Sequence, residues 1–167
     1  MPLKKAEPMN DLSSLPYRMG VGIMLLNAHN KVFVAKRIDN QFEAWQMPQG
    51  GIDAGEDAQT AVLRELNEET GLPPDAVEIL AQTPHMLRYR LPDSLIPKVW
   101  GGKFQGQDQI WFLLRLVGAE SLINIATEHA EFSEWRWAEP SELPTLIVPF
   151  KRELYEEILR VFADKLA

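Results

Sequence analysis

The chain has 167 residues, of which 46% are hydrophobic and 25% are charged, and this size and composition suit one globular domain with a hydrophobic core. The formal net charge of -7 argues against non-specific coating of nucleic acid, although a local basic patch could still bind phosphates. The sequence contains no cysteine, which excludes disulfides, thiolate catalysis and cysteine-ligated metals and fits the cytoplasm.

The first fifteen residues combine prolines, serines, an asparagine and charged residues, a composition typical of a mobile tail. Residues 16–167 are then expected to form a single domain. The tail has no apolar run of the length found in secretory signals, so a signal is not expected. No segment approaches the roughly 18 consecutive apolar residues that a membrane-spanning helix needs. We therefore expect a cytoplasmic protein with no membrane partner.

Strand-like patterns begin at Gly20. Two apolar, β-branched runs flank a polar turn, which predicts a hairpin with the sequences VGIMLL, NAHN and KVFVAKRI. A loop rich in Gly and Asp, QGGIDAGED, then leads into a predicted helix from Asp57 to Thr70. Asp57 or Glu56 lies near the N-terminus of this helix, and Gly71 ends it.

The second half of the chain alternates apolar runs with loops. The strands expected here have the sequences VEILAQTP, HMLRYRL, QIWFLLRLV and EFSEWRWA. Residues 92–108 contain prolines, glycines and lysines and predict a long loop, which in a compact domain is more often functional than ornamental. Residues 149–166 predict an amphipathic closing helix. Strands before and after a central helix indicate an α/β (α+β) sandwich with a mixed sheet.

The stretch RELNEETG crowds three carboxylates onto the central helix. Glu65, Glu68 and Glu69 lie at positions i, i+3 and i+4, so they project from one face and repel one another. A solvated acidic face is one interpretation. The other is a cleft where cations offset the repulsion, and oxygen ligands without His or Cys favour Mg²⁺ or Mn²⁺ over zinc.

The segment from Gly50 to Leu72 favours the second interpretation. After Gly50 come five residues, Glu56, seven residues and then REL-N-EE-T-GL, which resembles the Nudix box at every fixed position. The resemblance implies a loop-helix-loop that binds divalent metals, usually Mg²⁺, and hydrolyses a nucleoside diphosphate linked to another group. It also implies that Arg64 orients the carboxylates without being a metal ligand; a surface ion pair with Glu68 or Glu56 is the simpler alternative.

Segments outside the box resemble a narrower branch of this family, the bacterial RNA pyrophosphohydrolases and the related dinucleoside polyphosphate hydrolases. The resemblance covers the chain from about Tyr17 to its end and includes the segments 45–51, 87–90, 111–114, 135–137 and 150–152. Two departures leave details of RNA contact open. Ile110 stands where some members have a basic residue, and the N-terminal tail is longer.

Several residues outside the box are candidates for substrate binding. Cationic side chains could surround a polyphosphate with fixed positive charge, and Phe150 could stack on a base. Tyr89 matches a tyrosine of the same branch. The predicted substrate-binding residues are Arg18, Arg37, Arg88, Tyr89, Phe150 and Lys151.

Glu131 is the predicted fourth acidic residue, because this branch carries a Glu before the Phe that precedes the W-x-W strand. Glu128 and Glu134 are its rivals. The expected metal ligands are therefore Glu65, Glu68, Glu69 and Glu131, and the expected catalytic residues are Glu65, Glu131 and Arg64. Either Glu65 or Glu131 could handle the proton.

The resemblance implies Mg²⁺-dependent removal of pyrophosphate, or of phosphate stepwise, from the 5′-triphosphate end of RNA, with Mn²⁺ as a possible substitute. A dinucleoside polyphosphate such as diadenosine tetraphosphate is the alternative substrate. A non-catalytic module that binds nucleotides or RNA ends is a third hypothesis, although such modules usually have broken boxes. The sequence does not determine the oligomeric state, for which a monomer is the working expectation.

Overall fold

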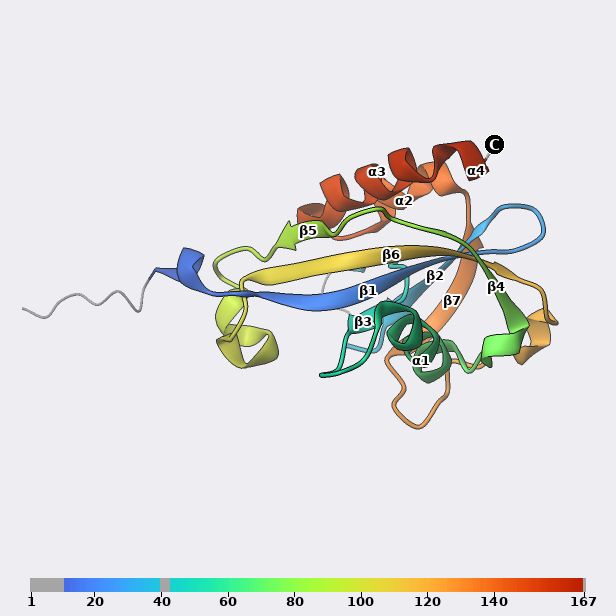
Figure 1. The fold of residues 1–167 in the computed structure, drawn as a ribbon, viewed down its shortest axis with the longest axis horizontal. Coiled ribbons are helices and arrows are strands. Elements are labelled where there is room, and N and C mark those ends of the chain that lie inside the picture. The colour runs from blue at the N-terminus through green and yellow to red at the C-terminus, as the bar shows by residue number, and fades with distance from the viewer. Residues whose placement is uncertain (1–10, 40–42, 167) are drawn as a thin grey trace, which may run out of the picture.

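A computed structural model describes residues 11–39 and 43–166, and it places them around one mixed sheet of seven strands (Figure 1). The strand order is β4-β6-β1-β2-β7, with β3 beside β1 and β5 beside β6. The strands are β1 Tyr17–Leu26, β2 Val32–Arg37, β3 Gln49–Gly51, β4 Val77–Gln82, β5 Leu87–Arg90, β6 Gly106–Leu116 and β7 Phe132–Ala138.

Helices cover both faces of the sheet. Helix α1, Ala58–Thr70, lies on one side, and α2 Leu143–Leu146, α3 Arg152–Val161 and α4 Ala163–Leu166 lie on the other (Figure 1). The predicted α/β sandwich with a mixed sheet is confirmed. Within residues 11–39 and 43–166, no helix is long and apolar enough to cross a membrane.

Strand β1 supplies side chains to the core on both faces of the sheet, because successive residues of a strand point to opposite sides. Val21, Ile23 and Leu25 pack with the buried face of α1. Met24 and Leu26 pack with the residues of α3 on the other face. Strand β1 therefore lies at the centre, where it pairs in parallel with β6 along its whole length.

The termini of α1 follow the sequence prediction. The carboxylate of Asp57 caps the helix by accepting a hydrogen bond of 2.7 Å from the backbone N–H of Thr60. Gly71 ends the helix in the left-handed region, with φ of 76°, which an L-residue with a side chain adopts only at a cost. The predicted helix is confirmed, and its N-terminal side chain is Asp57 rather than Glu56.

The regions at both ends of the chain differ from the sequence prediction. Residues 1–10 of the predicted tail lie outside the described residues, but Leu12–Ser14 forms a 3-10 turn. The side-chain amide of Gln105 donates hydrogen bonds to the carbonyls of Ser13 and Leu15, which attaches this segment to the domain. The closing helix is not continuous, because a 3-10 turn at Pro149–Lys151 precedes α3 and a break at Phe162 separates α3 from α4.

The predicted loop 92–108 is shorter than expected. Strand β6 already begins at Gly106, and the connection contains 3-10 turns at Ile96–Lys98 and Trp100–Gly102. The first residues of this strand are polar. Gln107 and Gln109 can nevertheless be buried in it, because they belong to a hydrogen-bond network. A pattern search for apolar strands starts too late for that reason.

Gly71 offers a test of how firmly α1 is joined to the segment that follows β6. A Cβ at Gly71 would lie 2.9 Å from the backbone carbonyl oxygen of Asn124, in addition to the left-handed strain. We expect Gly71→Ala to lower the free energy of unfolding by more than about 2 kcal/mol, since the strain alone costs roughly 1–2 kcal/mol. Urea unfolding followed by circular dichroism measures this.

Gly55→Ala is the matched control. Gly55 has φ of 80°, but a Cβ there meets no described atom within 4 Å. Its loss of stability should match the strain alone. Equal losses in the two variants would contradict the predicted contact between Gly71 and Asn124.

Candidate active site

Two adjacent glycines in β3 provide space for charged side chains on its two faces. A Cβ at Gly50 would lie 2.0 Å from the carboxylate carbon of Glu65, and a Cβ at Gly51 would lie 2.2 Å from a guanidinium nitrogen of Arg18. Because successive residues of a strand face opposite sides, the acidic group of α1 and the basic group of β1 lie on opposite faces of this short strand. The tight backbone approach explains why glycine stands at both positions.

Arg64 of α1 holds the carboxylates of the box together. Its guanidinium donates hydrogen bonds to Glu56 at 2.8 and 2.9 Å, to Glu65 at 2.9 Å and to Glu68 at 3.1 Å. It also donates to the carbonyl of Gly51 at 2.8 Å, which joins the helix to β3. These contacts lower the pKa of the Glu56 carboxyl to about 2. Arg64 thus makes both of the ion pairs that the sequence offered as alternatives, together with pairs to Glu65 and to Asp53.

Glu69 is a buried carboxylate whose charge is not offset by an ion pair with Arg64. Its side chain is 1% exposed, and neither carboxylate oxygen accepts a hydrogen bond within the part of the chain that the structure describes. Burial raises the pKa of Glu69 well above its usual value, and the negative charges of Glu131 and Glu65 raise it further. Burial also raises the pKa of Glu65, against the opposing effect of Arg64. A buried carboxylate in this position needs a cation or a proton.

Glu131 reaches the same region from the loop before β7. This loop is attached to the C-terminal end of α1, because Thr127 donates to the carbonyl of Glu68 at 2.6 Å and Asn124 donates to that of Thr70 at 2.7 Å. The carbonyl of Glu131 in turn accepts the N–H of Ile38 at 2.8 Å.

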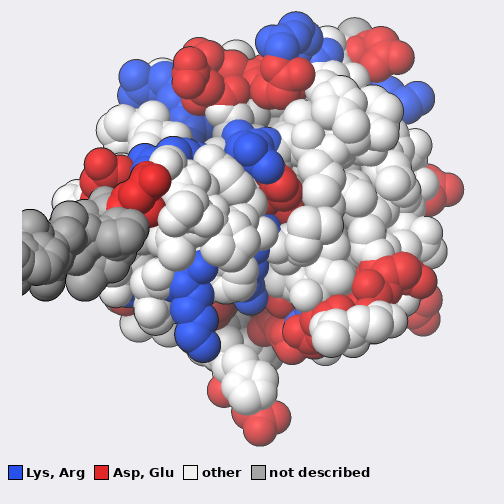
Figure 2. All heavy atoms as spheres, turned by 60° about the vertical axis from the view of Figure 1, so that its left-hand side comes forward, with Lys and Arg blue, Asp and Glu red and all other residues white. Residues whose placement is uncertain are grey.

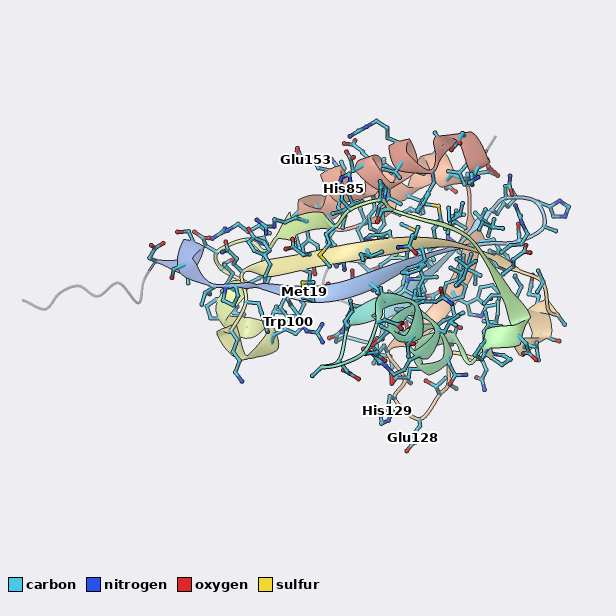
Figure 3. The ribbon with its side chains drawn as sticks, viewed as in Figure 1. Met19, His85, Trp100, Glu128, His129 and Glu153 are labelled. Atoms are coloured by element: carbon cyan, nitrogen blue, oxygen red, sulfur yellow. The ribbon has the colours of Figure 1, made fainter. Side chains whose placement is uncertain are left out.

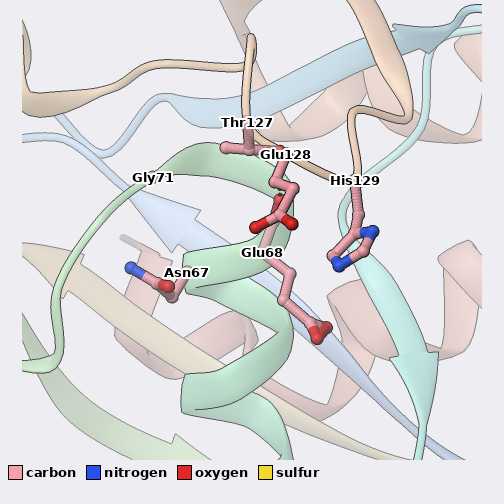
Figure 4. Close-up of a pocket in the computed structure, with 6 residues that line it drawn as sticks. All are labelled: Asn67, Glu68, Gly71, Thr127, Glu128 and His129. Atoms are coloured by element: carbon pink, nitrogen blue, oxygen red, sulfur yellow. Dashed lines mark hydrogen bonds between the residues drawn. The ribbon is translucent and has the colours of Figure 1, made fainter.

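The two rivals of Glu131 have different neighbours. Glu134 lies 3.9 Å from the amine of Lys36. Glu128 and His129 line a hollow of about 230 Å³ between the segment 127–129 and the C-terminal part of α1 (Figure 4). Glu68, one of the predicted metal ligands, lines the same hollow. His85 lies on the far side of the sheet from this hollow (Figure 3).

The residues are suited to a divalent metal, although the side chains are not arranged around a ready position. No group of three or more His, Asp or Glu in residues 11–39 and 43–166 is placed to hold a metal ion. The orphaned oxygens of Glu69 and the all-carboxylate donor set nevertheless fit a hard cation. Glu65 and Glu68 would have to turn from Arg64 to join them.

The other face of β3 carries a basic and aromatic cluster, formed by Gln49, Tyr89, Phe150 and Lys151. The amine of Lys151 is buried, lies 4.7 Å from the centroid of the Tyr89 ring and donates a 3.4 Å hydrogen bond to the side chain of Gln49. Burial, with the charge of Arg37, lowers the pKa of Lys151 to about 7. Phe150 packs against Tyr89 with ring centroids 6.2 Å apart.

Arg37 lies between the two halves of the site. Its own pKa is raised, first by a hydrogen bond to Asp39 and further by the charges of Glu131 and Glu69. Its charge also lowers the pKa of Lys151. Figure 2 shows lysine and arginine atoms in the middle of one face, bordered above and below by acidic groups.

Arg88 is not brought to this cluster. Its guanidinium makes a bidentate ion pair with Asp108, at 2.7 and 3.0 Å, and lies over the ring of Tyr17. In β5 it also points away from the face to which Tyr89 points. The structure therefore brings together the other predicted substrate-binding residues and leaves Arg88 aside.

A buried glutamine network was missed by the sequence reasoning. The side-chain amide of Gln109 donates to Gln49 at 3.0 Å and to Gln107 at 2.6 Å, and it accepts a bond from the indole N–H of Trp111 at 2.9 Å. This network orients Gln49 beneath Lys151. The available signal was the pair of glutamines at alternate positions in an otherwise apolar strand.

Comparison with known proteins agrees with this geometry. Residues 16–158 match the family model described as "NUDIX domain". The chain belongs to the NUDIX family. It is 50% identical over 155 residues to the RNA pyrophosphohydrolase of Dinoroseobacter shibae. The aligned region covers 93% of this chain and 97% of that protein. It is 53% identical over 154 residues to the RNA pyrophosphohydrolase of Sphingopyxis alaskensis, covering 92% and 98%.

Solved structures share the fold at low sequence identity. The E. coli dihydroneopterin triphosphate pyrophosphohydrolase has a TM-score of 0.67 and 18% identity, covering 85% of this chain and 96% of that one. A C. elegans Ap4A hydrolase in a binary complex has a TM-score of 0.64 and 17% identity, covering 88% and 98%. These neighbours confirm the Nudix fold.

The burial of Glu69 without a hydrogen-bond partner among the described residues leads to a prediction about thermal stability. We expect Glu69→Gln to raise the Tm of the protein in EDTA at neutral pH by roughly 2–4 °C. Without a metal, the buried Glu69 either keeps its charge or takes up a proton on folding, and glutamine avoids this cost of about 1 kcal/mol or more. Added Mg²⁺ should raise the Tm of the unsubstituted protein and leave that of the variant unchanged. Differential scanning calorimetry measures both effects.

Glu153→Gln serves as the control, since Glu153 is exposed on the α3 side of the sheet (Figure 3). Its Tm should follow that of the unsubstituted protein with and without Mg²⁺. A Glu69→Gln variant that is less stable in EDTA and still stabilised by Mg²⁺ would remove Glu69 from the predicted metal ligands.

Proposed function

We propose that this protein is an RNA pyrophosphohydrolase that uses Mg²⁺, with Mn²⁺ as a substitute, to trim the 5′-triphosphate end of RNA to a monophosphate. The observation that carries the proposal is the identity of about half of all aligned residues with RNA pyrophosphohydrolases over more than nine-tenths of the chain. The side-chain arrangement supports it, because carboxylates for metal binding and cations for phosphate binding lie on the two faces of one short strand. The lack of cysteines and this substrate suit a cytoplasmic protein.

In this proposal Glu65, Glu68, Glu69 and Glu131 hold the metal. When bound, the metal neutralises charge on phosphate oxygens and lowers the pKa of an attacking water. Arg64 positions the carboxylates, since it contacts Glu65 and Glu68 directly. Glu65 or Glu131 accepts the proton of the water that attacks phosphorus, and pyrophosphate leaves as the phosphoanhydride bond breaks.

The second half of the site holds the rest of the substrate. Arg18, Arg37 and Lys151 bind phosphate oxygens, while Tyr89 and Phe150 provide aromatic surface for a base. The polyphosphate crosses the edge of β3 to reach both halves, because Gly50 and Gly51 bring the carboxylate and the guanidinium close to this strand. The same residues could contact the second nucleoside of a dinucleoside polyphosphate, which is the alternative substrate.

A direct test is turnover of 5′-triphosphorylated RNA and of diadenosine tetraphosphate by the purified protein in Mg²⁺. We expect kcat/KM to be higher for the RNA, with pyrophosphate or phosphate released. Glu68→Gln should reduce kcat by at least about 100-fold while the Tm changes little, because it removes a charge that acts on the transition state.

Each other outcome has a meaning. Preference for the dinucleotide would make the alternative function correct. If Glu68→Gln retains activity, the assignment of the metal ligands is wrong. If neither substrate is turned over in a metal-dependent way, the hypothesis of a non-catalytic binding module is favoured.

Lys151 predicts a pH dependence of binding. With a pKa of about 7 in the free protein, Lys151 is charged below this pH and loses its proton above it. Binding of an anionic RNA end favours the charged form, so affinity should fall by roughly tenfold or more as pH rises from 6.5 to 8.5. Fluorescence anisotropy of labelled 5′-triphosphorylated RNA on the Glu68→Gln background measures this without turnover.

Lys151→Arg is the control, because arginine keeps its charge throughout this range. The difference between the two proteins cancels the ionisation of the substrate itself. Parallel pH profiles for Lys151 and Lys151→Arg would show that Lys151 does not contact the RNA end.

A further inference from the structure

Arg18 is unusual among the arginines of this protein. The others that the structure describes each make a hydrogen bond or an ion pair, for example Arg37 with Asp39 and Arg90 with Asp93. Arg18 alone makes neither with any described residue, although its side chain is only half exposed. Its N–H groups are therefore available to a ligand, and the planar fork of a guanidinium matches a phosphate.

Two contacts that involve neither a hydrogen bond nor an ion pair set the position of Arg18. The guanidinium fills the space where Gly51 has no side chain. In the second contact, the guanidinium carbon lies 5.3 Å from the centroid of the Trp100 ring, which is within the range of a cation–π interaction. Arg18 is thus placed between β3 and the loop 92–105, and no acidic group in residues 11–39 and 43–166 pairs with its charge.

The backbone of the loop is bent to present Trp100. Trp100 has φ of 50° and is followed by Gly101 and Gly102, with φ of 67° and 74°. A large L-residue with positive φ carries strain that persists only where the surrounding structure holds it, often at functional sites. Phe104 supports the indole from the side, with ring centroids 6.1 Å apart at 84°.

We propose that Trp100 is a positioning residue that holds Arg18 ready to bind a phosphate group of the substrate. The inference rests on the proposed function and assigns a role to loop 92–105 in it. An aromatic face suits this task better than a carboxylate, because it restricts the guanidinium and leaves its charge and its donors free for the anion. Trp100 and Met19 of β1 lie at the same end of the sheet (Figure 3).

The test compares steady-state kinetics of Trp100→Ala, Trp100→Phe and Arg18→Ala on 5′-triphosphorylated RNA. Trp100→Ala should raise KM by roughly tenfold and change kcat by less than about twofold, since the loss lies in binding. Trp100→Phe keeps an aromatic face and should restore most of the affinity. It also keeps the test valid if Trp100→Ala folds poorly.

A double-mutant cycle separates positioning from a structural role. If Trp100 acts through Arg18, adding Trp100→Ala to Arg18→Ala should raise KM no further. Both single variants should also lower the salt dependence of RNA binding by a similar amount, because each loses the same phosphate contact. Additive effects on KM, or an unchanged salt dependence in Trp100→Ala, would overturn the proposal.

Trp45→Ala controls for the loss of a half-buried tryptophan that stacks on cations. Trp45 lies 5.1 Å from the amine of Lys36 and 4.9 Å from the guanidinium of Arg136, and its substitution should leave KM unchanged. If the unsubstituted protein does not hydrolyse the RNA, the proposed function fails. If it does, and KM of Trp100→Ala is unchanged, only the role of Trp100 fails.

Discussion

The close approach of α1 to β3 is the constraint on which the rest of the site depends. Because Gly50 has no side chain, the Glu65 carboxylate lies against the strand backbone, and Arg64 completes the contact by donating to the carbonyl of Gly51. This packing buries Glu69 beside two other carboxylates, whose effect on its pKa the backbone N–H of Gln49 offsets only in part, and its oxygens make no hydrogen bond within the described residues. The fold thus maintains an excess of negative charge that a cation can relieve.

An excess of positive charge lies across the same strand. Arg18 occupies the place of a Gly51 side chain, and Lys151 is buried without a carboxylate partner in the part of the chain that is described. Neither half is balanced locally, and a polyphosphate with its metal complements both. This reciprocal arrangement explains how a protein with a net charge of -7 can offer a binding site for a polyanion.

Local features were predictable from the sequence because they depend on neighbouring residues. Asp57 caps the N-terminus of α1 and Gly71 ends its C-terminus, as these residue types commonly do. The spacing of Glu65, Glu68 and Glu69 placed them on one face of this helix. The parallel pairing of β1 with β6, the burial of Lys151 and the contact of Trp100 with Arg18 join segments far apart in the chain. The periodicity of a sequence does not reveal such pairs. For the same reason the ion pair with Asp108, which keeps Arg88 away from the basic and aromatic cluster, could not be predicted.

The most direct test of this account is a crystal structure of the Glu68→Gln variant with Mn²⁺ and a 5′-triphosphorylated dinucleotide. The account predicts anomalous density for manganese beside Glu65, Glu69 and Glu131, with the polyphosphate crossing the edge of β3 to the guanidinium of Arg18 and the amine of Lys151. Manganese bound away from Glu69, or a polyphosphate confined to one face of β3, would contradict it.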